Sequence, residues 1–219
     1  MALLPAHLDH TLLKPDCTAA QIRQLCQEAK EHQFASVCVP PCYVALAAQQ
    51  LAGTAVAVGT VVGFPFGYQA TRVKFREAEI AIEAGATELD MVLNISHLKS
   101  GELALIGEEI QDLADLAHLH RALLKVIIET ALLTDTERLD AANLSAIAGA
   151  DFVKTSTGYA SRGATVEDVQ TLRRLLPPTV RIKAAGGIRT RAAAEALLAA
   201  GADRIGSSNS VALLAESGD

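Results

Sequence analysis

The sequence predicts an α/β protein folded as one closed (β/α)8 barrel over residues 1–219. Short runs rich in Val and Ile alternate with longer amphipathic segments rich in Ala and Leu, which is the order typical of a parallel sheet. Eight such strand-then-helix units share the chain at about 27 residues each, near the minimum for one unit. No linker rich in Ser, Gly or Pro separates them, and no unit has the pattern of an edge strand. These three observations favour a closed barrel.

The expected strands are near-continuous apolar runs, as parallel strands covered on both faces should be. HLDHT at 7–11 is the weakest of them. The other seven are expected at 36–40, 55–64, 88–94, 123–130, 151–158, 180–187 and 203–208. An open doubly wound sheet is the alternative, but no G-x-G-x-x-G or G-x-x-x-x-G-K-[ST] motif follows any of these runs.

Capping signals mark the ends of the expected helices. The helices with recognisable boundaries are 17–33, 70–86, 165–176, 190–201 and 209–216. Thr18 and Thr165 each precede a helical pattern and have Gln21 and Asp168 three residues later, which predicts two N-caps. The triplet Ala-Gly-Ala comes directly before a strand at 84–86, 148–150 and 200–202, so each central glycine is expected to end a helix.

Composition and charge exclude several classes of protein. Half of the residues are hydrophobic and one fifth are charged, which is not typical of a disordered chain. The net charge is −6 and no basic cluster marks a nucleic-acid surface, so no nucleic-acid partner is expected. The first residues do not form a signal peptide, and the longest apolar stretch, 55–66, is too short and interrupted to span a membrane. We therefore expect a soluble cytoplasmic protein without a membrane partner.

The candidate catalytic residues are the polar side chains inside apolar strands, where an unpaired charge is costly. They are Asp9, Asp90, Lys125, Glu129, Lys154 and Lys183. Lys154 and Lys183 lie on consecutive strands, so their ammonium groups should repel each other and one should titrate near neutrality. A neutral buried amine attacks carbonyl carbon, the first step of Schiff-base catalysis. The alternative is a pair of ion-paired structural lysines.

The remaining charged strand residues have less specific roles. Asp90 can pair with either lysine or relay a proton through water. Lys125 and Glu129 are expected to share one face of their strand and to pair with neighbouring strands. The four Cys form no CxxC motif, and of the six His only His10 lies near the expected site, so reduced thiols and no bound metal are expected.

Three glycine-bearing turns at the carboxyl ends of strands are candidate phosphate sites, at 154–158, 184–187 and 206–210. Their candidate binding residues are Thr157, Gly186, Gly187, Gly206, Ser207 and Ser208. Glycine allows the backbone to approach a ligand closely, and the last turn leads directly into a helix. The alternative for that last turn is an ordinary helix cap.

From about His7 to Leu214 the chain resembles the deoxyribose-phosphate aldolases, a family of class I (Schiff-base) aldolases with the (β/α)8 fold. The segments that carry the resemblance include LDHTLLKPD (8–16), VVGFPFG (61–67), ELDMVLNI (88–95), KTSTG (154–158), KAAGGIRT (183–190) and GADRIGSS (201–208). The combination of KTSTG with KAAGGIRT at this spacing is the most specific of these signals.

The resemblance implies that Lys154 forms the Schiff base, Lys183 lowers the pKa of Lys154 and Asp90 serves the proton relay. It also implies pocket-lining positions at Asp9 and Cys38 and phosphate-binding positions at Gly186, Gly187, Ser207 and Ser208. The implied reaction is the reversible cleavage of 2-deoxy-D-ribose 5-phosphate to D-glyceraldehyde 3-phosphate and acetaldehyde, a step of deoxyribose phosphate catabolism. No metal or organic cofactor is implied, and a homodimer or homotetramer is expected.

One position departs from the family pattern. Some members have a basic residue directly after KTSTG, where this chain has Tyr159. Either Arg162 or Arg189 is expected to contact the phosphate instead, unless backbone groups and serines suffice. Because the chain ends at Asp219, no catalytic part for a C-terminal extension is expected. Two other functions stay open: a Schiff-base aldolase for a sugar of different length, and a catalytically silent phosphosugar-binding barrel.

Overall fold

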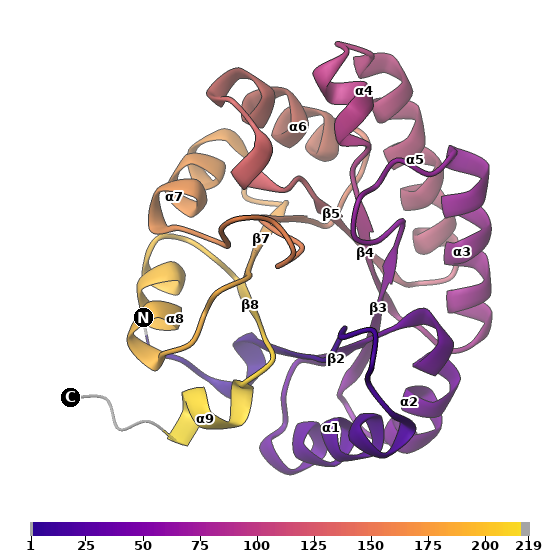
Figure 1. Ribbon diagram of the computed structural model, residues 1–219, viewed down its shortest axis with the longest axis vertical. Helices are drawn as coiled ribbons and strands as arrows, with labels where there is room; N and C mark the ends of the chain where they lie inside the picture. The colour runs from indigo at the N-terminus through magenta and orange to yellow at the C-terminus, as the bar shows by residue number, and fades with distance from the viewer. Residues whose placement is uncertain (1, 216–219) are drawn as a thin grey trace.

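Eight parallel strands close into a barrel surrounded by helices in the computed structural model, which describes residues 2–215 (Figure 1). The strands pair in chain order, and β1 completes the ring by pairing with β8. Their bounds are β1 (Leu8–Thr11), β2 (Ser36–Val39), β3 (Ala57–Val62), β4 (Glu88–Val92), β5 (Leu123–Ile127), β6 (Phe152–Lys154), β7 (Arg181–Ala185) and β8 (Arg204–Ser207). The expected closed barrel is confirmed, and the open doubly wound sheet is wrong.

The helices form the outer layer. They are α1 (Ala19–His32), α2 (Val44–Leu51), α3 (Thr71–Glu83), α4 (Ile95–Lys99), α5 (Leu103–Leu119), α6 (Asp135–Ile147), α7 (Val166–Leu175), α8 (Arg191–Ala199) and α9 (Ser210–Ala215). Short 3-10 helices occupy Pro5–His7, Pro41–Tyr43 and Thr130–Leu132. The expected last helix is confirmed up to Ala215, and its last expected residue, Glu216, lies outside the described residues.

The predicted helix signals are confirmed. The Thr18 side chain accepts a hydrogen bond from the backbone N–H of Gln21, and Thr165 does the same for Asp168. The central glycines of the three Ala-Gly-Ala triplets have φ values of 104°, 92° and 113°. These values lie in the left-handed region that glycine adopts without a steric cost, so each glycine can end its helix and turn the chain toward the next strand.

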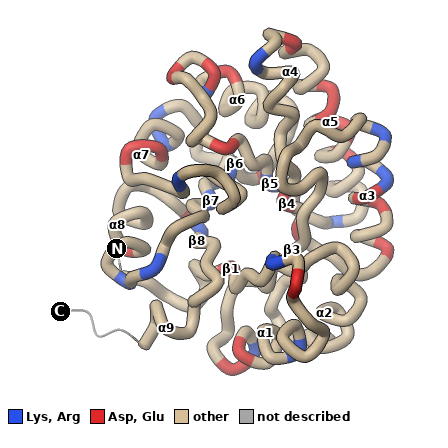
Figure 2. The backbone as a smooth tube through the Cα atoms, in the orientation of Figure 1, with Lys and Arg blue, Asp and Glu red and all other residues tan. Residues whose placement is uncertain are grey.

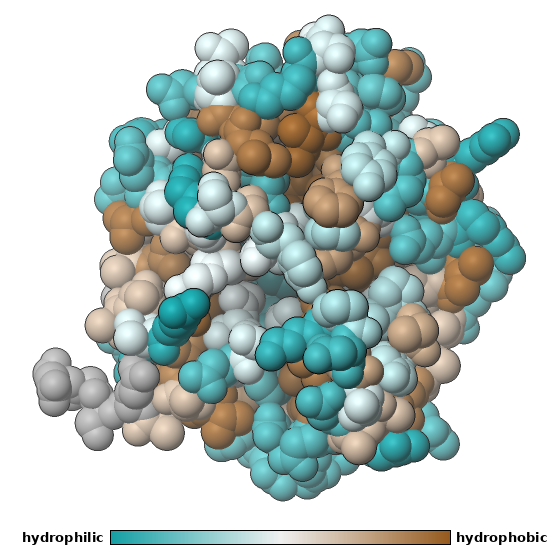
Figure 3. Space-filling view, in the orientation of Figure 1, coloured by the Kyte–Doolittle hydropathy of each residue, from teal (hydrophilic) through white to brown (hydrophobic). Residues whose placement is uncertain are grey.

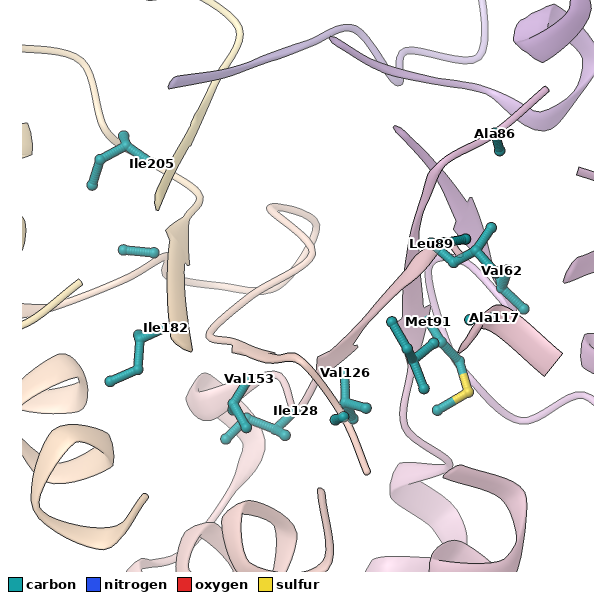
Figure 4. Packing of buried hydrophobic residues seen from close by; sticks show 14 of the residues in the cluster. Val62, Ala86, Leu89, Met91, Ala117, Val126, Ile128, Val153, Ile182 and Ile205 are labelled. Atoms are coloured by element: carbon teal, nitrogen blue, oxygen red, sulfur yellow. The ribbon is translucent and has the colours of Figure 1, made fainter. Parts of the chain in front are cut away.

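Strand side chains alternate between two environments, which explains how apolar strands carry charges. Side chains that point away from the barrel interior pack against the helices, as Figure 4 shows for Leu89, Val126, Val153, Ile182 and Ile205. The residues next to them point into the barrel, where most of the charged strand residues are at most 4% exposed. The apolar core therefore lies between strands and helices, and the buried charges lie in the barrel interior.

Two strands end earlier than their apolar runs. β5 ends at Ile127 because Glu129 adopts φ 52° and ψ 67°, a left-handed conformation that takes its side chain off the strand face. The prediction that Glu129 shares a face with Lys125 is therefore wrong. β6 ends at Lys154, which is thus the last residue of its strand and lies at the carboxyl end of the barrel, where sites form in this fold.

Candidate active site

Seven charged side chains meet inside the barrel. They are Asp9, Glu88, Asp90, Lys125, Lys154, Lys183 and Arg204, and ion pairs connect all of them. Charged segments of both signs accordingly lie on the strands around the barrel centre (Figure 2). Four cations face three carboxylates, so the cluster carries one excess positive charge when every group is ionised. One amine of this cluster can become neutral and leave the remaining charges balanced.

Asp90, on β4, is the shared partner of three lysines. Its Oδ1 lies 2.7 Å from Nζ of Lys125, and its Oδ2 lies 2.8 Å from Nζ of Lys154 and 2.7 Å from Nζ of Lys183. The register pairs Asp90 with Lys125 on the next strand and pairs Lys154 with Lys183. Because β5 lies between β4 and β6, Asp90 meets the latter two lysines across the interior of the closed barrel. Asp90 therefore contacts both candidate lysines at once.

The two candidate lysines have opposite pKa shifts. Burial lowers the pKa of Lys154 and the neighbouring charge of Lys183 lowers it further, while Asp90 only partly opposes them. Burial also acts against the charged form of Lys183, but Asp9 and Asp90 together raise the pKa of Lys183 above its ordinary value. Nζ of Lys183 is 2.6 Å from Oδ2 of Asp9, a contact for which Lys154 has no counterpart. Lys154 is thus the lysine with the lowered pKa, and burial is the largest cause.

A cavity of about 350 Å³ opens at the carboxyl ends of the strands, and Lys154 lines it. Hydrophilic side chains gather around the centre of this face in the space-filling view (Figure 3). The six candidate binding residues of the phosphate turns also line it: Thr157, Gly186, Gly187, Gly206, Ser207 and Ser208. The structure therefore brings the candidate nucleophile and the three candidate turns to one cavity.

Asp9 and Cys38 lie deeper in the barrel and are not among the described residues that line this cavity. Asp9 is fully buried and pairs with Lys183 and Arg204. Cys38 is also buried, and burial raises the pKa of its thiol to about 11, with the charge of Asp90 acting in the same direction. Nζ of Lys125 also lies 3.9 Å from Oδ2 of Asp9, so in this arrangement Asp9 serves the charge cluster.

The two turns after β6 and β7 touch each other. A Cβ atom on Gly163 would come within 1.9 Å of the carbonyl oxygen of Gly186, so only glycine fits at this crossing. Gly186 and Gly187 have φ values of 86° and 73°. In the turn after β8, Oγ of Ser207 accepts a hydrogen bond from the backbone N–H of Asn209 at 3.1 Å. The walls of the cavity are therefore held by backbone contacts.

The structure separates the two arginines expected from the sequence as alternative phosphate contacts. Arg189 lines the cavity, whereas Arg162 is bound to Asp168 with Nη2 3.2 Å from Oδ1. Lys14 also lines the cavity and was not predicted. The available signal was its place in LDHTLLKPD, just beyond the first strand, because residues that follow barrel strands lie at the site.

Glu129 has a positioning contact that the sequence did not reveal. Its Oε2 accepts hydrogen bonds from the backbone N–H of Thr157, at 3.0 Å, and from the Thr157 hydroxyl. The Thr157 hydroxyl in turn accepts a hydrogen bond from the backbone N–H of Tyr159 at 3.0 Å. Glu129 is only 3% exposed, so these bonds form away from water and fix the wall of the cavity that follows Lys154.

The chemistry of the site follows from its groups. A buried amine with a lowered pKa at a cavity wall can attack a carbonyl carbon, and the neighbouring carboxylate can accept and return protons.

Residues 2–215 contain no group of three or more His, Cys, Asp or Glu side chains placed to hold a metal ion. In the same part of the chain, no helix is long and apolar enough to cross a membrane, and Cys17, Cys26, Cys38 and Cys42 are free thiols.

Comparison with known proteins identifies relatives of the whole barrel. The model of the DeoC/LacD family aldolases matches residues 4–214. The deoxyribose-phosphate aldolase of Bacillus cereus (strain AH820) is 50% identical over 207 residues, which cover 94% of this chain and 92% of that protein.

Solved structures of similar proteins superpose on nearly the whole chain. A putative deoxyribose-phosphate aldolase from Coccidioides immitis superposes with a TM-score of 0.92 at 42% identity, over 96% of this chain and 84% of that one. The deoxyribose phosphate aldolase from Aeropyrum pernix, described as a tetramer, superposes with a TM-score of 0.90 at 35% identity, over 96% of this chain and 89% of that one.

Proposed function

The chain belongs to the DeoC/LacD family of aldolases, and from this membership we propose that it is a class I aldolase with its Schiff base on Lys154. Its reaction is the reversible cleavage of 2-deoxy-D-ribose 5-phosphate to D-glyceraldehyde 3-phosphate and acetaldehyde. The observation that carries the proposal is the combination found at Lys154. This amine lines the cavity, has a lowered pKa and contacts a carboxylate that it shares with a second cation.

The first half of the reaction builds an electron sink. The neutral Nζ of Lys154 attacks C1 of the open-chain substrate, a C–N bond forms and the carbonyl oxygen takes up a proton. Loss of water from this carbinolamine gives an iminium ion on Lys154. Asp90, which lies 2.8 Å from Nζ, is placed to move these protons directly or through water, and the charged Lys183 keeps Asp90 ionised.

The second half breaks the carbon–carbon bond. The C3 hydroxyl loses its proton, the C2–C3 bond breaks and its electron pair moves through C1 to the iminium nitrogen. D-Glyceraldehyde 3-phosphate leaves, and an enamine remains on Lys154. Protonation of the enamine at C2 and hydrolysis of the resulting iminium release acetaldehyde and restore the amine. Every step uses only the substrate, water and groups of this chain, so the proposal includes no cofactor.

The phosphate is proposed to bind at the turns that follow β6, β7 and β8. Gly186, Gly187, Ser207 and Ser208 line the cavity at the ends of two adjacent strands, and Arg189 adds a positive charge to the same wall. Backbone N–H groups, hydroxyls and a guanidinium are the donors that bind phosphate in proteins. Because the chain has a net charge of −6, capture of an anion depends on such a local group of donors.

Trapping with borohydride tests this proposal. Acetaldehyde and sodium borohydride should convert Lys154 to a stable secondary amine that peptide mass spectrometry identifies. Lys154→Ala should abolish the adduct and the cleavage of 2-deoxyribose 5-phosphate, whereas Lys30→Met, at the far end of α1, should leave both unchanged. An adduct on another lysine, or its persistence in Lys154→Ala, would contradict the site. Trapping without cleavage of this pentose phosphate would favour an aldolase for a sugar of another length.

Assembly and cellular role complete the proposal. We expect one aldolase domain that forms a homodimer or homotetramer and acts in the cytoplasm in deoxyribose phosphate catabolism. The Aeropyrum pernix relative is described as a tetramer, and Leu119 and Ile147 expose 78% and 85% of their surface on the outer helices. Light scattering of the purified protein measures the number of subunits.

A further inference from the structure

Tyr159 stands where some relatives have a basic residue, and the structure assigns it a different task. We propose that Tyr159 holds the loop after β1 at the cavity mouth and so places Lys14 as a second phosphate-binding cation. The first loop of the barrel then contributes to selectivity for phosphorylated over free sugar. The inference rests on the proposed function, because it concerns how the same cavity recognises the phosphate of its substrate.

Two side-chain contacts and one backbone hydrogen bond fix Tyr159 although 54% of the residue is exposed. Its hydroxyl donates a hydrogen bond to the backbone carbonyl of Leu13 at 3.0 Å, which joins the loop after β6 to the loop after β1. Its ring packs edge-on against Phe64 with 5.5 Å between ring centroids. Its backbone N–H donates to the hydroxyl of Thr157. The two loops that Tyr159 joins both border the open end of the barrel (Figure 1).

The loop after β1 is anchored on both sides of Leu13. The backbone N–H of Leu12 donates to the carbonyl of Cys38 at 3.0 Å, and the N–H of Cys17 donates to the carbonyl of Lys14 at 3.1 Å. The second bond turns the chain directly after Lys14. Together with the bond from Tyr159, these contacts keep Lys14 beside the cavity rather than on an unrestrained loop.

Barrel closure brings this loop next to the phosphate turns. β1 pairs with β8, and His10 is the register partner of Ser207. The loop that follows β1 therefore leaves the barrel beside the turn that contains Ser207 and Ser208. Lys14 and Ser208 line the same cavity, so a phosphate bound at the β8 turn lies within reach of the flexible Lys14 side chain.

The charges on the cavity wall fit an anion. Among the described lining residues, Lys14, Lys154 and Arg189 are cationic and none is acidic, although the whole chain carries a net charge of −6. Lys154 is engaged with Asp90. Lys14 and Arg189 have no ion pair or side-chain hydrogen bond within residues 2–215, so both remain available to a ligand. A cavity wall with two available cations and no described acidic residue favours a phosphate monoester over a neutral sugar.

The test compares Lys14→Met with Lys30→Met, which removes the same charge from the last turn of α1 at the opposite end of the barrel. The ratio of kcat/KM for 2-deoxyribose 5-phosphate to that for 2-deoxyribose is measured at low and high salt. Lys14→Met should lower this ratio about fivefold, mainly through KM, and weaken its salt dependence, as expected for one exposed ionic contact. Lys30→Met should change neither. An unchanged ratio in Lys14→Met would overturn the role of Lys14.

Tyr159→Phe tests the hydrogen bond from Tyr159 to the loop after β1, because it removes only the hydroxyl and keeps the contact with Phe64. This variant should lower the ratio by a smaller factor, and adding it to Lys14→Met should have no further effect. Independent, multiplicative effects of the two substitutions would overturn the role of Tyr159 in placing Lys14.

Calorimetry with inorganic phosphate separates this inference from the proposed function, because it needs no turnover. Weaker phosphate binding in Lys14→Met supports the inference even without cleavage, and equal binding refutes it even when the enzyme is active.

Discussion

Replacing Lys183 by Met should move the pH dependence of Schiff-base formation upward. In the wild-type protein Lys183 is a permanent positive charge beside Lys154, and both ammonium groups share Oδ2 of Asp90. Removing Lys183 relieves the repulsion of protonated Lys154 and leaves Oδ2 of Asp90 to Lys154. Both changes favour the charged amine, so the lowered pKa of Lys154 rises toward its ordinary value.

The contact distances set the scale of this pKa shift. The nitrogens of Lys154 and Lys183 lie 2.8 and 2.7 Å from one oxygen atom, so their separation cannot exceed the sum of these distances, about 5.5 Å. Two unit charges no farther apart than this repel each other by at least about 3 kcal/mol at an effective dielectric constant of about 20, equal to about 2 pKa units. Water that enters the space left by the shorter charge-free side chain reduces the effect. We expect the profile to move by about 1 to 2 pH units.

The assay is the rate of borohydride trapping with acetaldehyde between pH 5 and 10, which reports on the neutral amine without the rest of the reaction. The midpoint for Lys183→Met should be higher than that of the wild type. Lys125→Met is the matched comparison, because it removes another cation of the cluster from the opposite oxygen of Asp90. Its shift should be smaller. A midpoint that stays in place in Lys183→Met would refute the electrostatic reasoning, and equal shifts in both variants would show that proximity has no part in it.

Three further predictions concern other parts of the barrel. Iodoacetamide should modify the exposed Cys42 and spare the buried Cys38, whose pKa is about 11, until urea unfolds the protein; rapid modification of both in the native state would contradict the burial of Cys38. Lys74→Met should lower the free energy of unfolding in urea by about 3 kcal/mol, because it leaves Glu109 as a buried, unpaired carboxylate. Glu129→Gln should raise KM for 2-deoxyribose 5-phosphate severalfold and leave acetaldehyde trapping intact, because it loosens the cavity wall without touching the nucleophile; a loss of trapping would show that Glu129 acts on the amine itself.

The sequence by itself was sufficient for the fold class and for the three central residues. Alternation of apolar strands with amphipathic helices can be recognised along the chain without tertiary contacts, so the barrel was predictable. Asp90, Lys154 and Lys183 were found because a charge inside an apolar run is costly and therefore conspicuous. Asp90 lies on β4, which is not next to the strands of the two lysines, so its contact with both forms only across the interior of the closed barrel.

Only the tertiary structure shows which of the two candidate lysines has the lowered pKa. The difference between Lys154 and Lys183 depends on Asp9, which comes from β1 and raises the pKa of Lys183, whereas Lys154 makes no ion pair with Asp9. The cavity takes in Lys14 and excludes Arg162 for a similar reason, because Arg162 folds back on an aspartate and β1 closes beside β8. A pattern along the chain records which residues are present. Electrostatic interactions depend on separations through space and on burial, and both are set only when the barrel closes.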